Sequence, residues 1–168
     1  MRTNDEADFD AFVVARGAAL RRTAYLLCGD WHAAEDLVQT TLTSVYIRWK
    51  RIHKPGARAE YARKVLTRAY IDTTRKKSNG EAPLGDLPDA PAARNGDPDV
   101  RVALMAALSR ASPGYRAILV LRFWEDQSIE QTAALLGRSP SAVRSGTARG
   151  LVQLRTLLGD ELAELPRP

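Results

Sequence analysis

The residues best suited to contact another molecule lie in the stretch SIEQTAALLGRSPSAVRSGTARGLVQLR, residues 128–155. Ser128 and Gln131 have the spacing of a capping box, and Gly137 can adopt the positive φ that ends a short helix. Ser139, followed by a proline, predicts the start of a second helix after a tight turn. The stretch therefore predicts two short helices around a glycine turn, a helix-turn-helix.

The second of these helices has two different faces. Its expected buried stripe is Val143, Thr147, Gly150, Leu151 and Leu154. The other face suits a DNA major groove, because arginine can pair with guanine through two hydrogen bonds while serine hydroxyls and backbone amides bind phosphate. The candidate DNA contacts are Arg138, Ser139, Ser141, Ala142, Arg144, Ser145, Ala148 and Arg149. The alternative is an ordinary pair of helices with a solvated basic face.

A second candidate surface is the basic segment 50–77. Its ten basic residues against two acids, Glu60 and Asp72, give a net charge of +8. Tyr61 and Tyr70 lie among these cations, and aromatic rings can stack on unpaired bases while cations follow the phosphates. Alternatively, the tyrosines are packing residues and the cations are solvated. The candidates for strand contact are Lys50, Arg51, Lys54, Arg58, Tyr61, Arg63, Lys64, Arg68 and Arg75.

Helical periodicity in the first part of the chain predicts the elements that position the basic segment. We expect one helix around residues 9–26, a second capped by Asp30, and a third over about 59–77, after a loop that holds Pro55 and Gly56. The apolar stripe of the second helix is Val38, Leu42, Val45 and Trp49. The third helix is expected to bury Ala62, Val65, Leu66 and Ala69.

The last part of the chain is also expected to be helical, and no alternating strand pattern competes. A helix near Asp99 would pack through Val100, Ala103, Leu104, Ala107 and Leu108. Ser112 before Pro113 predicts another helix start, with Ser112 as its cap.

Residues 79–98, NGEAPLGDLPDAPAARNGDP, separate these two units and are expected to form a flexible acidic linker. The fold class is therefore all-α, with two small helical domains, 1–78 and 99–168, of which the second contains the helix-turn-helix.

The composition of the chain limits the kinds of partner and cofactor that are expected. The chain of 168 residues has a formal net charge of +5, which favours a polyanionic partner. Cys28, His32 and His53 offer neither an internal disulfide nor a zinc-binding spacing, so we expect no metal or cofactor. Acidic residues stand near the amino terminus where a signal peptide would be apolar, so a cytoplasmic protein without a membrane span is expected.

Four segments together resemble the extracytoplasmic-function sigma factors, especially actinobacterial members. They are AEDLVQTTL (34–42), the basic helix ending in RKK, the acidic linker, and LGRSPSAVRSGTARGLVQLR, in the family's order. The resemblance implies a sigma factor that binds core RNA polymerase and directs promoter-specific transcription initiation.

The resemblance also implies a division of labour. The first domain would dock on the β′ clamp helices of polymerase through Glu35, Asp36, Gln39 and Thr43. The basic segment would melt the minus-ten promoter element and capture a flipped base. Many members carry an asparagine where this chain has Arg68, which leaves the minus-ten sequence open. The second domain would read the minus-thirty-five element and meet the β flap, with Phe123 and Trp124 either in that contact or in the core. An anti-sigma partner is compatible with the family, although no residue identifies one.

A stand-alone regulator and an enzyme are the two alternative classes of function. A stand-alone regulator with the same helix-turn-helix would bind duplex DNA unaided, whereas a sigma factor would bind weakly until core polymerase is supplied. An enzyme would need a phosphate loop, a metal cluster or an activated nucleophile, and the sequence offers none of these. Cys28 stands beside apolar residues, so a buried thiol is expected.

Overall fold

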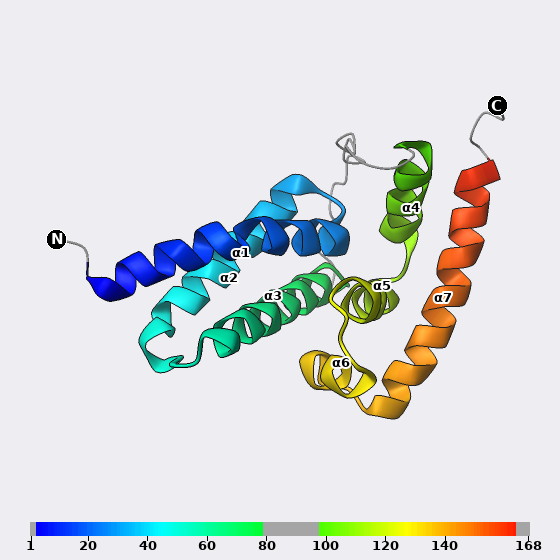
Figure 1. Ribbon diagram of the computed structural model, residues 1–168. Helices are drawn as coiled ribbons and strands as arrows, with labels where there is room; N and C mark the ends of the chain where they lie inside the picture. Colours follow the sequence, from blue (N-terminus) through cyan, green and yellow to red (C-terminus); the bar gives the residue numbers. More distant parts are fainter. Residues whose placement is uncertain (1–2, 79–97, 164–168) are drawn as a thin grey trace.

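The computed structural model describes residues 3–78 and 98–163, and every regular element in these two ranges is helical, as predicted (Figure 1). The first unit contains α1 (Asn4–Cys28), α2 (Trp31–Ile47), a short 3-10 helix η1 (Trp49–Arg51) and α3 (Pro55–Ser78). The second unit contains α4 (Pro98–Arg110), α5 (Pro113–Leu119), a π-helical turn η2 (Val120–Trp124), α6 (Ile129–Leu136) and α7 (Pro140–Ala163). The expected linker lies outside the described residues, apart from Pro98.

Helix α2 is the centre of the first unit, with α1 and α3 packed against it. Its carboxylate cap is confirmed, because Asp30 accepts hydrogen bonds from the amides of His32 and Ala33 at 3.1 and 3.3 Å. The predicted stripe is also buried, although Trp49 belongs to η1 rather than to α2 itself. One helix start differs from the prediction: α3 begins at Pro55, about one turn earlier, because proline is well suited to the first helical position.

The buried residues of helix α1 lie mainly near its carboxyl-terminal end. Its fully buried positions include Thr23, Ala24 and Leu27, whereas Phe9 and Phe12 are only partly buried at the edge of the core. Both phenylalanine rings meet Trp49 edge-on, with ring centroids 5.2 and 5.3 Å away. The aromatic residues therefore close the far end of the first unit, and the small residues face the second.

In the second unit α4, α5 and α6 all pack against α7. Two predicted details are wrong. Leu104 is 37% exposed, so it lies outside the buried face that Ala103, Ala107 and Leu108 form. Ser112 stands at the cap position of α5, but its side chain makes no capping hydrogen bond; its amide instead donates to Gln153 of α7 at 3.0 Å. Packing on α7 thus replaces the local cap.

The two units share one apolar cluster. Ala24 and Leu27 of α1 and Leu66 of α3 lie in it together with Ala117 of α5 and Val120 of η2. Helices α5 and α6 accordingly lie beside α3 in Figure 1. The described parts of the two units pack as one body, which the sequence-based prediction of two tethered domains did not include.

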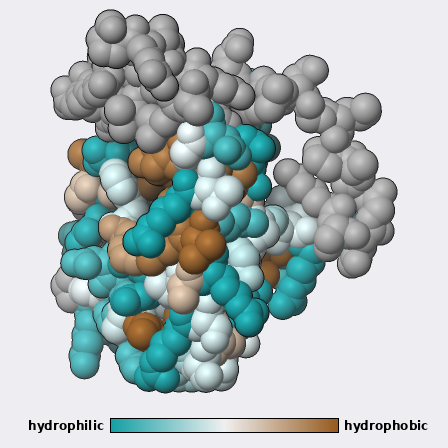
Figure 2. All heavy atoms as spheres, turned by 90° about the vertical axis from the view of Figure 1, so that its right-hand side faces the viewer, coloured by the Kyte–Doolittle hydropathy of each residue, from teal (hydrophilic) through white to brown (hydrophobic). Residues whose placement is uncertain are grey.

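The side formed by α4 and α7 presents apolar patches framed by hydrophilic side chains (Figure 2). Its exposed large apolar residues are Val102 and Leu104 on α4 and Val152 on α7. Among residues 3–78 and 98–163, none of the helices has both the length and the apolar character needed to cross a membrane.

Candidate nucleic-acid interface

Helix α6, the turn after it and the start of α7 have the geometry that the sequence predicts. Ser128 Oγ accepts a hydrogen bond from the Gln131 amide at 3.0 Å, and the Gln131 side chain accepts one from the Ser128 amide at 2.9 Å. Gly137 ends α6 with φ 63°, and Ser139 Oγ accepts from the Ala142 amide at 3.1 Å. These caps satisfy amides that would otherwise lack partners, so they fix where α7 begins.

Close packing decides which face of α7 is exposed. Val143, Gly146 and Gly150 are buried, and a Cβ on Gly150 would lie 3.3 Å from Tyr115 Cβ in α5. A Cβ on Gly146 would collide with Ile118, a close approach that the predicted stripe did not include. The opposite face is therefore left to solvent, and it carries Ser141, Arg144, Ser145 and Ala148, with Ala142 and Arg149 also exposed.

Two arginines near this face have neighbours in the protein. Arg144 Nη2 lies 3.9 Å from Glu130 Oε1 of α6, and the two side chains are 61% and 69% exposed. A pair this exposed contributes little, so Arg144 remains available to another anion. The exposed Arg138 guanidinium lies beside Gly114 at the start of α5. The face is basic, as predicted, but α6 supplies an acid that inspection of α7 alone misses.

The candidate residues of the basic segment differ in exposure. The exposed cations among them are Lys50, Arg51, Lys54, Lys64, Arg68 and Arg75, and Lys50 Nζ lies 3.8 Å from Asp5 Oδ2 of α1. Arg58 instead lies 3.8 Å from the centre of the Trp49 ring and donates to the Ile52 carbonyl at 3.1 Å, so it holds the loop before α3. Tyr61 is partly buried, with the Arg48 guanidinium 5.8 Å from its ring centre. Tyr70 is 6% exposed, so the packing alternative is confirmed for it and base stacking is not.

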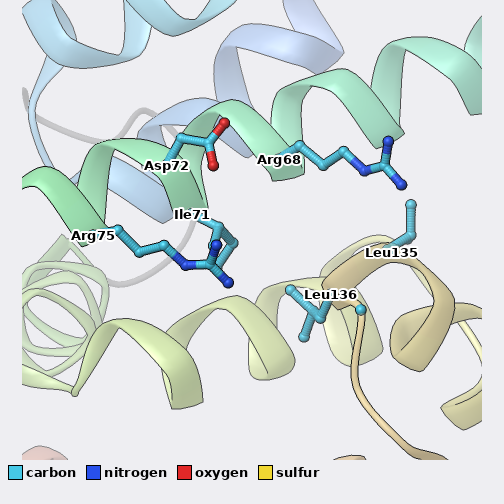
Figure 3. A pocket seen from close by; sticks show the side chains of 7 residues that line it. Arg68, Ile71, Asp72, Arg75, Leu135 and Leu136 are labelled. Carbon is cyan, nitrogen blue, oxygen red and sulfur yellow. The ribbon is translucent and has the colours of Figure 1, made fainter.

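A cleft of about 290 Å³ separates the basic helix from the helix-turn-helix (Figure 3). Arg68 and Arg75 project from α3 on one side, and Leu135 and Leu136 from α6 stand opposite. Its remaining lining residues are Ile71, Asp72 and Gly137. The candidate strand contacts on α3 are therefore directly next to the second unit.

The expected polymerase-binding residues lie on the outer side of α2. Asp36, Gln39 and Thr43 are exposed, and Thr43 Oγ1 donates to the Gln39 carbonyl at 2.8 Å. Glu35 is less free, because its carboxylate accepts a hydrogen bond from Arg21 Nε of α1 at 2.8 Å. Asp36 and Gln39 are thus the more accessible members of this set.

Sequence reasoning missed three residues that join the units, namely Thr23, Arg116 and Glu125. Glu125, just after η2, accepts hydrogen bonds from Thr23 of α1 and, at 2.9 Å, from Arg63 Nε of α3. Arg116 of α5 is only 5% exposed and donates from Nε to the Leu26 carbonyl at 2.6 Å. Arg116 stands immediately before an apolar run, and a charged residue in such a position was the available signal.

Burial shifts the ionisation of the groups around Arg116. Removal from water lowers the pKa of the Arg116 guanidinium, and the nearby phenol groups act in the opposite direction. Burial raises the pKa of Tyr70 to about 12, although the charge of Arg116 opposes this shift. Burial likewise raises the pKa of Tyr25. The contact between the units is therefore a poorly solvated polar site.

Three further expectations concern apolar side chains. Phe123 and Trp124 are 59% and 53% exposed, so the core-packing alternative is wrong for both. The π-helical geometry of η2 turns them outward, away from Val120 and Leu121, which are buried. Cys28 was expected to be buried, but it is only partly so.

The sequence matches two family descriptions, Sigma-70 region 2 over residues 12–80 and Sigma-70 region 4 over residues 101–154. It is 37% identical to an RNA polymerase sigma-E factor of Streptomyces coelicolor, over 88% of this chain and 84% of that protein. It is 35% identical to RNA polymerase sigma factor CarQ of Myxococcus xanthus, over 80% and 79%. It is 33% identical to ECF RNA polymerase sigma factor SigE of Mycolicibacterium smegmatis, over 96% and 67%.

The fold is also similar to that of the sigma factor RpoE from Bartonella quintana, solved in complex with the anti-sigma factor NepR. The TM-score is 0.72 at 23% identity, and the match covers 90% of this chain and 97% of that one.

The chain belongs to the extracytoplasmic-function sigma factors of the sigma-70 family, as the sequence resemblance indicated. It is an RNA polymerase sigma factor that directs transcription initiation, and proteins of this family are not enzymes. The first unit contains region 2 and the second contains region 4.

Proposed function

We propose that the first unit binds core polymerase and opens the minus-ten element while the second unit reads the minus-thirty-five element. The observation that carries the proposal is the two-sided geometry of α7. Its buried side is fixed by glycines against α5, and its opposite side exposes Ser141, Arg144 and Ser145 at the capped start of the helix. Such a helix start after a tight turn is the part of a helix-turn-helix that contacts base edges.

The residues on α2 and α3 divide the work of the first unit. Asp36 and Gln39 would contact the β′ clamp helices, with Thr43 beside them and Glu35 held by Arg21. The exposed cations of the basic segment would follow the phosphates of the opened strand. The partly buried Arg58 and Tyr61 would shape the loop that receives a flipped base, which must offset a few kcal/mol of unstacking.

The second unit has a surface for a further polymerase contact. Phe123 and Trp124 are exposed side by side in sequence, and Val102, Leu104 and Val152 are exposed on α4 and α7. Exposed large apolar side chains are suited to contact with a protein partner, and the β flap is the partner that the family resemblance implies. An anti-sigma partner is supported only by analogy with the Bartonella sigma factor, and cytoplasmic location follows from the role in transcription.

The proposed domain boundaries are 1–78, 79–98 and 99–168, with the acidic segment 79–98 as a flexible tether. The segment 79–98 is negatively charged, whereas residues 50–77 are positively charged. A negative segment is unsuited to DNA contact and would instead lie near cationic surfaces of polymerase.

Reconstitution with core polymerase tests the proposal. The chain should bind core enzyme and give transcripts with defined start points on genomic DNA of its host, while binding duplex DNA weakly by itself. A stand-alone regulator would instead bind an operator tightly without polymerase. Tight independent binding together with no core-dependent transcripts would therefore contradict the proposal.

A further inference from the structure

One acidic side chain stands at the edge of the basic face of α7. Glu130 belongs to the first turn of α6, and its Oε1 lies 3.9 Å from Nη2 of Arg144. Both side chains are mostly exposed, so the pair lies on the surface that the proposed function turns toward DNA. A negative charge on such a surface weakens the attraction to the phosphates of any sequence. Affinity for DNA therefore does not explain the position of this acid.

The start of α6 explains an acid at this position but not its neighbour. A carboxylate in the first turn of a helix is stabilised by the partial positive charge there, wherever the side chain points. The contact with Arg144 depends instead on the packing of α6 beside the start of α7 (Figure 1). Ala133 of α6 and Val143 of α7 are buried in one apolar cluster with Ile118 of α5. This packing fixes both helix starts and holds Glu130 beside Arg144.

The guanidinium of Arg144 has enough donors for two partners at once. An arginine carries five N–H groups in a planar fork, and a guanine edge accepts two of them through O6 and N7. Because the fork has two edges, a carboxylate beside Nη2 can face one edge while a guanine takes the other. Arg144 can therefore contact a guanine without leaving Glu130.

A phosphate is a different ligand for the same guanidinium, because it carries a full negative charge. The exposed pair is weak enough for Arg144 to leave it, but the carboxylate then stays next to any phosphate that replaces it. Two like unit charges about 4 Å apart repel each other even in water, and more strongly where DNA excludes water. A guanine edge is uncharged and does not meet this repulsion. Glu130 therefore lowers the affinity of Arg144 for phosphate much more than its affinity for guanine.

Two other exposed arginines near this face, Arg138 and Arg149, differ from Arg144. Within residues 3–78 and 98–163, no carboxylate forms a salt bridge with either of them. Both are therefore suited to phosphate contacts, which place a protein on the duplex without reading its sequence. The acid beside Arg144 sets this arginine apart. Specificity arises from an element that disfavours the wrong contact as well as from one that favours the right contact.

We propose that Glu130 is a specificity-determining residue of the second unit, which holds Arg144 for a guanine edge in the minus-thirty-five element and disfavours its use on phosphate. The inference rests on the proposed function of α7 in reading that element. It assigns part of the sequence reading to α6, a helix that contributes none of the predicted DNA contacts. Glu130 is a positioning residue, because it acts through Arg144.

Glu130→Gln is the direct test, because it removes the charge and keeps the size of the side chain. Glu6→Gln is the matched control, since Glu6 is also an acid in the first turn of a helix, α1. The two substitutions change the net charge and the helix start in the same way. Both are made in the parent and in Arg144→Ala, and thermal unfolding checks that each variant folds. The set separates an effect through Arg144 from a direct contact of Glu130 with DNA.

The first readout is the selection of minus-thirty-five sequences by the assembled holoenzyme. Binding to promoter fragments randomised over this element gives the preference for each base, and Arg144→Ala identifies the position that Arg144 reads. Glu130→Gln should lower the guanine preference at that position about fivefold, and Glu6→Gln should stay within about twofold of the parent. In the Arg144→Ala background, Glu130→Gln should have no further effect on base preference.

The second readout is the salt dependence of holoenzyme binding to a fragment that lacks the preferred base at that position. Release of Arg144 to a phosphate adds one neutralised phosphate, so in Glu130→Gln the slope of log K against log salt concentration should become steeper by about 0.9. A purely structural role of Glu130 would lower the affinity without this change of slope. The Glu6→Gln holoenzyme should keep the slope of the parent.

Four results would count against these inferences. Unchanged guanine preference in Glu130→Gln, or a uniform loss across all sequences in Arg144→Ala, would overturn the proposal. An equal effect of Glu130→Gln with and without Arg144 would show that Glu130 contacts a base itself and would contradict positioning. Lost preference with an unchanged salt slope would rule out the release of Arg144 to phosphate. A parent holoenzyme without any minus-thirty-five preference would instead refute the proposed function, so the two failures are distinguishable.

Discussion

The Nε of Arg116 donates a hydrogen bond to the carbonyl of Leu26 across 2.6 Å, although the two residues are 90 positions apart. This places a cation from α5 at the carboxyl end of α1, where unpaired carbonyls carry partial negative charge. Gly29 makes the contact possible in two ways. Its φ of 72° turns the chain out of α1, and a Cβ at this position would lie 3.1 Å from Arg116 Nη2.

Gly29→Ala should therefore destabilise the protein more than backbone strain alone requires. Alanine in the left-handed region costs about 1 to 2 kcal/mol, and displacement of the Arg116 guanidinium adds to it. Gly137→Ala is the matched control, since Gly137 has φ 63° but open space around its Cβ position. Denaturant unfolding of both variants measures the difference, and equal losses would show that Arg116 does not depend on Gly29.

Arg144→Ala should change base discrimination at the minus-thirty-five element. If its guanidinium contacts a base, discrimination at one position should fall by about 1 to 3 kcal/mol. Competition among promoters with single substitutions, measured with the polymerase complex, tests this. A uniform loss across all promoter variants would identify Arg144 as a phosphate contact instead.

Asp36→Asn should weaken binding to core polymerase about tenfold or more, because a charged hydrogen-bonding group on the exposed face of α2 loses its charge. Titration of labelled protein with core enzyme gives the affinity. Asp8→Asn makes the same chemical change at an exposed position of α1 and should leave it unaltered. Comparable losses in both variants would contradict a specific role for Asp36.

Tyr70 should make stability depend on alkaline pH. Burial raises its pKa to about 12 from the ordinary value of 10.0, so between these values the unfolded chain releases the proton first. Its contribution is complete below about pH 10 and is lost as the pH rises through about 12, a change of about 2 to 3 kcal/mol.

Tyr70→Phe removes this titration. The difference in unfolding free energy between the parent and Tyr70→Phe should therefore vary between about pH 10 and about pH 12, in the direction that favours the variant at high pH. Chemical denaturation over this range measures it. A difference that stays constant with pH would show that the phenol is solvated in the folded protein.

Local patterns predicted much of the fold because their causes lie within a few residues. Asp30 and the pair of Ser128 and Gln131 cap their helices through amides two or three positions away. The stripe of Val38, Leu42 and Val45 is buried because helical periodicity places it on one side of α2. The exposed face at the start of α7 was predicted for the same reason, because helical spacing places it opposite the buried stripe.

Local patterns failed or left alternatives open where distant elements decide the environment of a residue. Gln153 of α7 takes the amide beside the expected Ser112 cap. The sequence left packing and base stacking open for Tyr70, and its place in the apolar cluster shared by both units decides for packing. Phe123 and Trp124 are exposed because a π-helical turn changes which side chains face inward. No periodicity within these segments contains that information.

The sequence by itself determined an all-helical chain of two units, the caps that start their helices, the basic face of α7 and membership of a sigma factor family. Each depends on spacing along one segment or on an order of motifs. Only the tertiary structure decided that Glu125 meets Arg63 and that Arg116 caps α1, because these contacts join residues 62 and 90 positions apart. Contacts of this kind depend on how whole helices pack, and no local propensity encodes them.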